Sequence, residues 1–414
     1  MQAFSPSKSF SAPVQLGLRE NARPFAWLVL INAFVGAMVG LERSLFPDFA
    51  REAFGVETAT AVLSFIAVFG LFKAAANYFA GRWAQRLGRK ALLMAGWVLM
   101  IPVPLLLFWA PSWTVVVAAN ALLGAGQGLA WSSTVVMKID LVGPKQRGWA
   151  MGINEFAGYV AVGVVALLST YAAEFWGTRW VLLSGVVLAV VGLAASWLLV
   201  PDTRAHAALE AAQTDARPTS TAKSLFWDTT WRNPQLRALT QAGLVNNLND
   251  GMVWGLFPIF LAQAHATPQS VGWIVGVYPM VWGLGQLLTG RLGDRMPKRR
   301  LLFLGMALQG LVLLAFPSLP GPWAWGIAAA ALGWGTALVY PTFLSALSDV
   351  VSPQDRAASV GIFRLWRDLG YVVGALGSGW IADRLGVPAA ILAVGALTLA
   401  SALPFARLNA HHQG

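Results

Sequence analysis

The sequence contains no cysteine, and only 11% of its 414 residues are charged. Without cysteine the chain can form no disulfide and no thiolate metal site. The four histidines, His206, His265, His411 and His412, are not spaced as a catalytic triad or a metal site. No nucleophile–base pair and no cofactor-binding loop is visible either. We therefore expect a protein that is not an enzyme and that needs no metal and no cofactor.

Long polar stretches are also scarce, because 57% of the residues are hydrophobic and the mean hydropathy is +0.61. A soluble domain carries about 25% charged residues, whereas a membrane-spanning helix needs about 20 mostly apolar residues. Twelve segments meet that need: 24–46, 57–81, 91–110, 113–138, 148–173, 179–200, 238–263, 269–290, 300–317, 321–348, 357–380 and 388–406. They are too long and too uniformly apolar for the strands of a membrane barrel. The sequence therefore predicts an all-α membrane protein with twelve transmembrane helices.

The net charge of +11 is explained by membrane topology rather than by nucleic-acid binding. With both termini in the cytoplasm, most Lys and Arg residues fall on the cytoplasmic side, as the positive-inside rule requires. The exceptions are Arg43, Arg51, Arg179 and Arg384 on the opposite side, and Lys73, Arg364 and Arg367 within the membrane. Anionic lipid headgroups are the expected counterpart of the basic loops. Residues 1–23 lack the apolar core of a secretory signal, so we expect a multi-pass protein of the cytoplasmic (inner) membrane.

The chain repeats itself at an offset of 209 residues. GRWAQRLGRKALL at 81–93 matches GRLGDRMPKRRLL at 290–302. The same offset relates Gly124 to Gly333, Asp140 to Asp349, Pro144 to Pro353 and Arg147 to Arg356. The two parts of the chain are therefore two copies of one six-helix unit.

These copies define the expected domain organisation. Residues 1–201 form the first six-helix bundle and residues 237–414 the second, while the polar segment 202–236 is a cytoplasmic linker. Two parallel six-helix repeats are typical of transporters whose halves rock around a site near the middle of the membrane.

The repeated loop resembles the signature loop of the major facilitator superfamily. That pattern is a glycine, an acidic residue four positions later, then arginine, glycine and a basic pair. The matching positions, which we expect to form gating loops, are Gly81, Gln85, Arg86, Gly88 and Arg89 in the first copy and Gly290, Asp294 and Arg295 in the second. The first copy departs from the family because Gln85 stands where an acid is usual. The resemblance covers nearly the whole chain and implies two pseudo-symmetric six-helix bundles and secondary transport by alternating access.

The resemblance does not extend to one subfamily. Proton-coupled drug exporters of the family carry an Arg three residues before a Gln-Gly pair in the fourth helix. Here Gln127 and Gly128 are present, but Gly124 occupies the Arg position. The Gly-Pro motif of the fifth helix is also missing. Both departures weaken a direct transfer of that coupling mechanism.

Three charges lie within two turns of the expected helix 357–380: Arg364, Arg367 and Asp368. Arg364 and Asp368 are four residues apart and share a helix face, so we expect them to pair. Arg367 then either binds an anionic substrate group or pairs with an acid such as Glu155, which matches Arg364 under the repeat. A charge in lipid costs roughly 2.5 to over 10 kcal/mol. The group therefore faces a cavity or other helices, as a transport site or as a structural network.

The expected helix 238–263 is also polar at mid-depth, where it carries Asn246, Asn247, Asn249 and Asp250. The resemblance implies that this helix lines the central cavity. Burial favours the protonated form of a carboxylate, which makes Asp250 a candidate for carrying a proton. The alternative is an Asp held by its neighbouring amides. The full set of proton-coupling candidates is Asp250, Asp368, Glu42 and Glu155.

Other polar residues in the spans have simpler interpretations. Glu42 and Arg43 end the first helix near the outer face, where adjacent opposite charges are more often an interfacial anchor than a transport site. Lys73 lies deep in the second helix and is expected to pair with an acid that the sequence does not identify. Asn77 and Gln286 occupy equivalent positions and are expected to bond helix to helix.

The aromatic residues Trp131 and Tyr340 correspond to each other under the 209-residue offset. The resemblance places both on cavity-lining helices. An aromatic-walled cavity with few charges suits amphipathic or aromatic solutes. The substrate-binding candidates are Arg367, Arg364, Asn246, Trp131 and Tyr340.

Together these observations predict a secondary active transporter that exports a small amphipathic organic solute in exchange for protons. One alternative is a proton-linked importer of a small organic anion, with Arg367 as the carboxylate clamp. A second is a receptor on the same fold that transports nothing. The expected partners are a small-molecule substrate, protons and the lipid bilayer, with no nucleic acid, and we expect a monomer.

Overall fold

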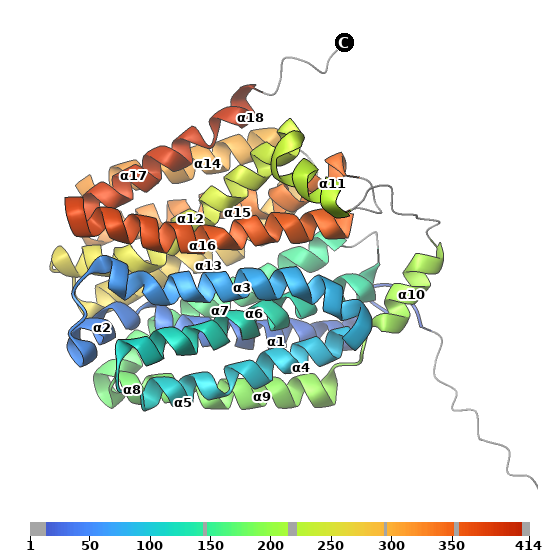
Figure 1. Ribbon diagram of the computed structural model, residues 1–414, viewed down its shortest axis with the longest axis horizontal. Coiled ribbons are helices and arrows are strands. Elements are labelled where there is room, and N and C mark those ends of the chain that lie inside the picture. Colours follow the sequence, from blue (N-terminus) through green and yellow to red (C-terminus); the bar gives the residue numbers. More distant parts are fainter. Residues whose placement is uncertain (1–13, 144–146, 214–221, 294–295, 352–355, 408–414) are drawn as a thin grey trace, which may run out of the picture.

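The computed structural model describes residues 14–143, 147–213, 222–293, 296–351 and 356–407. Within these residues the chain is helical and contains no strand. Long helices run side by side from one end of the molecule to the other (Figure 1). We call the end that carries α2 the α2 end, and the end that carries α10 the linker end. The structure confirms the expected all-α fold.

The N-terminal half of the chain supplies the first six expected spans. Its helices are α1 (Ala22–Arg43), α2 (Phe46–Phe54), α3 (Ala59–Leu87), α4 (Arg89–Met100), α5 (Pro102–Phe108), α6 (Trp113–Val142), α7 (Arg147–Trp176), α8 (Thr178–Leu183) and α9 (Gly185–Leu199). Helices α4 and α5 together make one span, and so do α8 and α9. Pro102 begins α5 one residue after the end of α4, where its missing N–H interrupts the helical hydrogen bonds.

The C-terminal half supplies the other six spans. Its helices are α12 (Pro234–Gln263), α13 (Pro268–Gly293), α14 (Lys298–Ala315), the 3₁₀ turn η3 (Phe316–Ser318), α15 (Pro322–Val350), α16 (Arg356–Leu385), α17 (Val387–Ala400) and α18 (Leu403–Arg407). Between the halves lie α10 (Arg204–Gln213), α11 (Ala222–Trp227) and the π-helical turn η2 (Asp228–Arg232).

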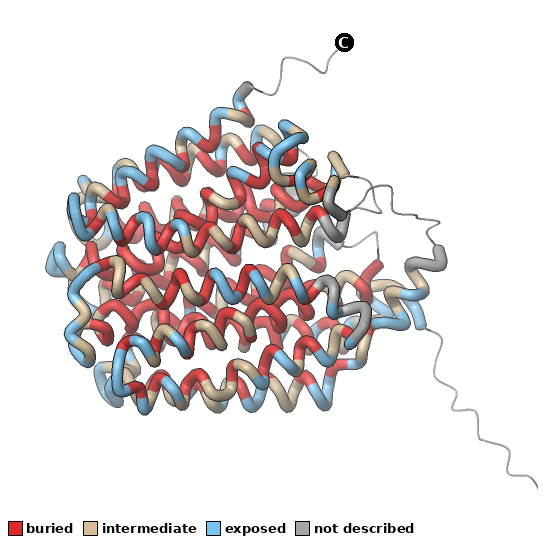
Figure 2. The backbone as a smooth tube through the Cα atoms, in the orientation of Figure 1, coloured by how far each residue is buried: buried red, intermediate tan, exposed pale blue. Residues whose placement is uncertain are grey.

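Two of the expected spans differ from the rest in polarity. Within the described residues, ten segments are long and apolar enough to cross a membrane. The two that fall outside this set are α12 and α16, which carry the polar clusters of the sequence. These two helices pack against each other, and the middle of the molecule is where buried backbone is concentrated (Figure 2). Because a charged side chain is costly in lipid, polar helices take central places with their polar groups against protein.

The two halves meet mainly along two pairs of helices. Helix α3 packs against α16, as Figure 1 shows, and α7 packs against α13. Within the N-terminal half, α6 packs against α3 and α1 against α7. The interface between the halves is thus built from four long helices that carry polar side chains at mid-length.

The linker end repeats one ion pair in both halves. Arg89 contacts Asp140 with Nε and Oδ2 2.9 Å apart. Lys298 contacts Asp349 with Nζ and Oδ2 2.6 Å apart, at the two positions related by the 209-residue offset. Gly88 joins α3 to α4 with φ of 91°, a value that favours glycine. Each pair ties the start of one span to the end of the next.

The remaining residues expected in the gating loops are described only in part. Gly81, Gln85 and Arg86 continue α3, and Gly290 continues α13. The side-chain surroundings of these four residues lie outside the described structure. Asp294 and Arg295 lie outside the described residues altogether.

The fourth span explains why Gly124 replaces the arginine of the drug exporters. A Cβ atom at this position of α6 would overlap the backbone carbonyl oxygen of Phe69 in α3. The close approach of the two helices leaves no room for a side chain. An arginine at this position would therefore clash with α3.

We expect Gly124→Ala to lower the free energy of unfolding by about 1–3 kcal/mol, because the added methyl group forces α3 and α6 apart. Gly377→Ala is the matched control, since a Cβ there meets nothing within 4 Å. The control is expected to be neutral or up to about 1 kcal/mol stabilising, because Ala is the better helix former. Thermal unfolding of the purified protein in detergent measures both variants. Equal stability of the two variants would contradict the tight crossing.

Candidate functional site

A small cavity lies between the two halves. It is lined by Lys73, Asn77, Trp131, Ser132, Glu155, Tyr159, Tyr340, Arg364, Arg367 and Asp368. These residues come from α3, α6 and α7 of the N-terminal half and from α15 and α16 of the C-terminal half. The cavity volume is about 20 Å³, enough for about one water molecule. This space is therefore too small for an organic solute.

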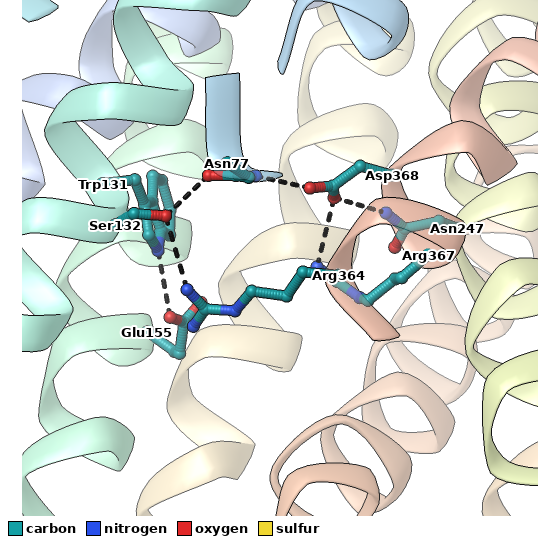
Figure 3. Close-up of polar contacts among 8 residues, drawn as sticks. All are labelled: Asn77, Trp131, Ser132, Glu155, Asn247, Arg364, Arg367 and Asp368. Carbon is teal, nitrogen blue, oxygen red and sulfur yellow. Dashed lines mark hydrogen bonds and ion pairs between the residues drawn. The ribbon is translucent and has the colours of Figure 1, made fainter. Parts of the chain in front are cut away.

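Asp368 is the centre of the polar contacts around this cavity. Its carboxylate accepts hydrogen bonds from the Asn77 side chain of α3 and from Asn247 Nδ2 of α12, the latter at 3.3 Å. Arg367 Nη1 lies 3.6 Å from Asp368 Oδ1. Figure 3 shows Asn77 reaching from the opposite half toward this carboxylate. One buried acid thus holds groups from both halves.

The same network continues into the N-terminal half. Ser132 Oγ donates to Asn77 Oδ1 at 2.6 Å, and Arg364 Nη1 donates to Ser132 Oγ at 3.4 Å (Figure 3). The expectation that Asn77 bonds one helix to another is met by these contacts. The chain of hydrogen bonds runs from α12 through α16, α3 and α6 and back to α16.

The pairing predicted between Arg364 and Asp368 is wrong. Arg364 reaches across the interface to Ser132, and Arg367 is the arginine that contacts Asp368. The long arginine stem lets Arg367 turn back toward its neighbour, although their Cβ atoms point in different directions. The guanidinium of Arg367 also lies over the ring of Tyr340, 4.1 Å from its centroid.

Glu155 lies on the far side of the cavity and does not pair with Arg367 as suggested. Its Oε1 atom accepts hydrogen bonds from Trp131 Nε1 at 2.9 Å and from Asn154 Nδ2 at 3.0 Å. Its Oε2 atom is buried without a hydrogen-bond partner among the described residues. A carboxylate with one oxygen fixed and the other free is able to accept a further donor.

Lys73 has aromatic rings around it instead of the expected acid. Its Nζ atom lies 5.1 Å from the ring centroid of Tyr371, 5.6 Å from that of Phe69 and 5.9 Å from that of Trp131. No carboxylate lies within ion-pair distance of this ammonium in the part of the chain that the structure describes. Cation–π contacts therefore take the place of a salt bridge here.

Asp250 and Asn246 lie outside the cavity lining. Asp250 Oδ1 accepts a hydrogen bond from the hydroxyl of Tyr278, which lies 3.2 Å from Thr336 Oγ1. Asp250 Oδ2 and both polar atoms of the Asn246 side chain are buried without partners among the described residues. The alternative considered for Asp250, a carboxylate held by the amides of its own helix, is not what is observed, because its partner is a tyrosine of α13.

The interpretation of Glu42 and Arg43 as an interfacial anchor is wrong. Both side chains are buried, with 2% and 1% of their surface exposed. The guanidinium of Arg43 lies over Trp254 of the other half, 4.2 Å from the ring centroid. The ring centroids of Phe65 and Phe69 of α3 lie 5.8 Å and 4.9 Å from the same guanidinium, so the end of α1 is buried between α3 and α12.

Lys138 is one of the basic residues expected on the cytoplasmic side, but its side chain is fully buried. Its ammonium donates to Asn154 Oδ1, and Thr134 Oγ1 lies 3.0 Å from Asn32 Oδ1 in the same cluster. A signal was present, because Lys138 is four residues after Thr134 and seven after Trp131, which places all three on one face of α6. Because Lys138 is the last residue of the expected span 113–138, it was placed with the cytoplasmic residues despite this pattern.

Comparisons with known proteins agree with this architecture. The family model described as Major Facilitator Superfamily matches residues 26–246 and 239–412. The chain is 23% identical over 339 residues to the multidrug resistance protein MdtG of Klebsiella pneumoniae (strain 342), covering 80% of each chain. It is 25% identical over 411 residues to the uncharacterized MFS-type transporter PA1993 of Pseudomonas aeruginosa, covering 94% of this chain and 96% of that one. The crystal structure of the human organic anion transporter MFSD10 (TETRAN) matches with a TM-score of 0.70 at 15% identity, covering 93% and 99% of the two chains.

We expect Asn77→Leu to lower the free energy of unfolding by about 1–3 kcal/mol, because it removes a donor from the buried Asp368 and an acceptor from Ser132. Gln286→Met is the matched control at the position equivalent by the repeat. Gln286 is buried, but its side-chain atoms have no hydrogen-bond partner among the described residues, so its replacement is expected to be neutral or stabilising. Thermal unfolding in detergent compares the two. A loss for Asn77→Leu no larger than that for Gln286→Met would contradict a stabilising role for the contacts of Asn77.

Proposed function

The chain belongs to the Major Facilitator Superfamily, and from that premise we propose that it exports a small amphipathic organic solute in exchange for protons. It is a transporter and not an enzyme. The observation that carries the proposal is the position of Asp368, a buried carboxylate that lines the central cavity and is bonded to both halves.

Alternating access follows from the size of the cavity. A space of about 20 Å³ admits no organic solute, so the halves must separate on one side before a solute enters. We propose that residues 1–201 and 237–414 move as two bundles and that residues 202–236 connect them. The interface of α3 with α16 and of α7 with α13 is then the surface that opens and closes.

A proton on Asp368 would change the contacts that join the halves. As a carboxylate, Asp368 accepts from Asn77 and attracts Arg367. Protonation removes the charge that strengthens both contacts, and the protonated oxygen can no longer accept in the same way. Loading of this site with a proton thus weakens the bridge between α16 and α3. That is the link between proton binding and conformational change that the proposal requires.

Asp250 is proposed as a second proton site. Its Oδ2 atom has no partner among the described residues, and its Oδ1 atom is held by Tyr278 of a neighbouring helix. A proton on Oδ2 would therefore break no existing hydrogen bond. Glu42 and Glu155 stay candidates for the same reason, because each has one buried oxygen without a described partner.

The solute class is inferred from the aromatic walls of the cavity. Trp131 lies 5.2 Å from Tyr159, and Tyr159 stacks on Trp282 with ring centroids 3.6 Å apart. Flat apolar faces of this kind bind aromatic or amphipathic molecules. Export is supported by the name of the MdtG relatives, which are called multidrug resistance proteins.

The orientation rests on the basic residues of the linker end. Arg89, Lys90, Lys298, Arg299 and Arg300 all lie there, at the starts of α4 and α14. By the positive-inside rule we propose that this end faces the cytoplasm and that the protein acts as a monomer in the cytoplasmic membrane.

The proposal predicts proton release from inverted membrane vesicles. In vesicles with an acidic lumen, addition of an exported solute should release lumenal protons, which a pH-sensitive dye detects. A panel of lipophilic cations, aromatic acids, sugars and amino acids serves as substrates. We expect Asp368→Asn to abolish the proton movement, because the amide cannot be protonated, and Asp250→Asn to reduce it.

Glu57→Gln is the control, because it removes an exposed carboxylate from the α2 end. It should leave the proton movement unchanged. Transport driven by the pH gradient in Asp368→Asn would refute the role of Asp368. Saturable binding of a compound without any flux in the wild type would favour a receptor.

A second function, proton-linked import of an organic anion, is favoured by the charges of the cavity. Lys73, Arg364 and Arg367 face it against only two acids. Arg367 is 3% exposed, and its Nε and Nη2 atoms have no described hydrogen-bond partner. A planar guanidinium with free N–H groups is suited to a carboxylate.

The direction of proton movement separates the two functions. An aromatic carboxylate, its neutral amide and the matching amine are added to the same vesicles. Symport of the carboxylate should carry protons into the lumen, the reverse of antiport, and Arg367→Gln should reduce its rate about tenfold or more, since a charged hydrogen bond contributes about 1.5–3 kcal/mol. Arg300→Gln, which removes an exposed arginine, should have no effect. Equal responses to the amide or the amine would exclude the anion importer.

A further inference from the structure

The α2 end of the interface carries a carboxylate contact between the halves. Asp383, near the end of α16, accepts hydrogen bonds from the backbone N–H groups of Ala59 and Thr60, the latter at 3.0 Å. These residues form the first turn of α3 in the opposite half. The first N–H groups of a helix have no partner within the helix, and its N-terminus attracts negative charge. Asp383 thus caps the N-terminus of α3 from the other side of the interface.

A second contact lies at the position related by the repeat. Glu174, near the end of α7, corresponds to Asp383 under the 209-residue offset, and Gln269 corresponds to Thr60. Gln269 Nε2 donates to Glu174 Oε1 at 2.6 Å. This contact runs from the N-terminal half to α13 of the C-terminal half. Both helix pairs of the interface therefore carry one carboxylate contact at the α2 end.

The surroundings of the two contacts repeat in detail. Thr58 accepts a hydrogen bond from Ala61 N at 3.4 Å before α3, and the equivalent Thr267 accepts one from Ser270 N at 3.2 Å before α13. Gly177 and Gly386, which follow the two acids, have φ of 79° and 88°. The agreement extends to backbone geometry, so the acids are parts of one repeated arrangement.

The segment around Asp383 also matches the gating loop of the linker end. GWIADRLG at 379–386 has the spacing of GRWAQRLG at 81–88. Gly386 has φ of 88° and ψ of 157°, and Gly88 has φ of 91° and ψ of 154°. The same turn therefore occurs at opposite ends of the molecule, and at the α2 end it carries an acid.

The same helix pairs are more loosely packed toward the linker end. A Cβ at Gly361 of α16 would meet nothing within 4 Å, and one at Gly152 of α7 would meet only the Gln286 carbonyl oxygen at 3.6 Å. At the α2 end, a Cβ at Gly379 of α16 would meet the backbone of Thr60 at 2.8 Å. The α3–α16 pair is thus closely packed beside Asp383 and open at Gly361.

We propose that Asp383 and Glu174 are positioning residues that hold the α2 end closed, and that both contacts must break before a solute passes that end. The inference rests on the proposed alternating access. Asp383 contributes more than Glu174, because it accepts from two backbone N–H groups at a helix N-terminus. Pro268, the equivalent of Ala59, has no N–H to offer, which leaves a single side-chain donor for Glu174.

The absence of cysteine allows a direct test with single reporters. Leu63→Cys reports on the α2 end, because Leu63 is buried in α3 against Gly255 of the other half. Gly361→Cys reports on the linker end. A membrane-impermeant maleimide is applied to right-side-out and inverted vesicles, and the labelling rate of each reporter is measured with and without changes at the two acids.

We expect Asp383→Asn to raise the labelling rate of Leu63→Cys from the α2 end about two- to fivefold and to lower that of Gly361→Cys. Asp383 is exposed, and a negative charge at an exposed helix N-terminus contributes about 0.3–1 kcal/mol. Glu174→Gln should act in the same direction and less strongly, and the double variant should show the product of the two effects. Asp383→Ala should exceed Asp383→Asn, since it removes both acceptor oxygens. Glu57→Gln should change neither rate.

Opposite changes of the two reporters are the readout that a merely stabilising contact would not give. Faster labelling of both reporters, or no change in either, would overturn the proposal. Labelling requires neither a substrate nor protons. Opposite shifts of the two reporters without any solute-evoked proton movement would therefore retain the role of the acids and reject proton-coupled export. Solute-evoked proton movement without opposite shifts would retain proton-coupled export and reject the role of the acids.

Discussion

Ionised groups inside a membrane must face protein or water, and this constraint places the helices of this protein. Helices α12 and α16 are too polar for lipid and lie against each other in the middle of the molecule. Their charges are surrounded by groups from both halves, with Asp368 bonded to Asn77 and Asn247. The polar residues therefore do two things at once: they are kept from lipid by the interface, and they hold that interface together.

The two copies of the repeat agree at the two ends of the molecule and differ around the cavity. Ion pairs at the linker end and threonine caps at the α2 end recur at the 209-residue offset. Around the cavity the same offset relates Asp368 to Tyr159 and Lys73 to Trp282. Each half thus contributes a charge where the other contributes an aromatic ring, which gives a cavity with both charged and apolar walls from two related halves.

Much of the fold was predictable, because span length and apolar composition are properties of the sequence. The cavity lining was predicted in part: six of the candidate residues meet there, namely Glu155, Trp131, Tyr340, Arg364, Arg367 and Asp368. The pairings were less predictable. Helix geometry fixes the direction of Cβ atoms but not the end of a long arginine, which is why Arg367 rather than Arg364 contacts Asp368.

Depth in the membrane was the other source of error. Lys138 and Arg43 lie near the ends of their spans, where a charge is usually assigned to water. Both are buried because neighbouring long helices pack around them: Asn154 of α7 accepts from Lys138, and the rings of Phe65, Phe69 and Trp254 surround the guanidinium of Arg43. Which helices pack around the end of a span is a tertiary property, and it cannot be predicted from the apolar pattern of the spans themselves.

Pro268 has a consequence for the path of opening. The two helix pairs of the interface are alike in position but unequal in strength, since the α13 side lacks the backbone donor that the α3 side offers. Two halves that are held more weakly along one helix pair separate first along that pair and rotate about the other pair. We therefore expect the α2 end to open as a wedge along α7 and α13, with α3 and α16 as the hinge line, so that the first solute-sized gap is bordered by residues of only one side of the interface.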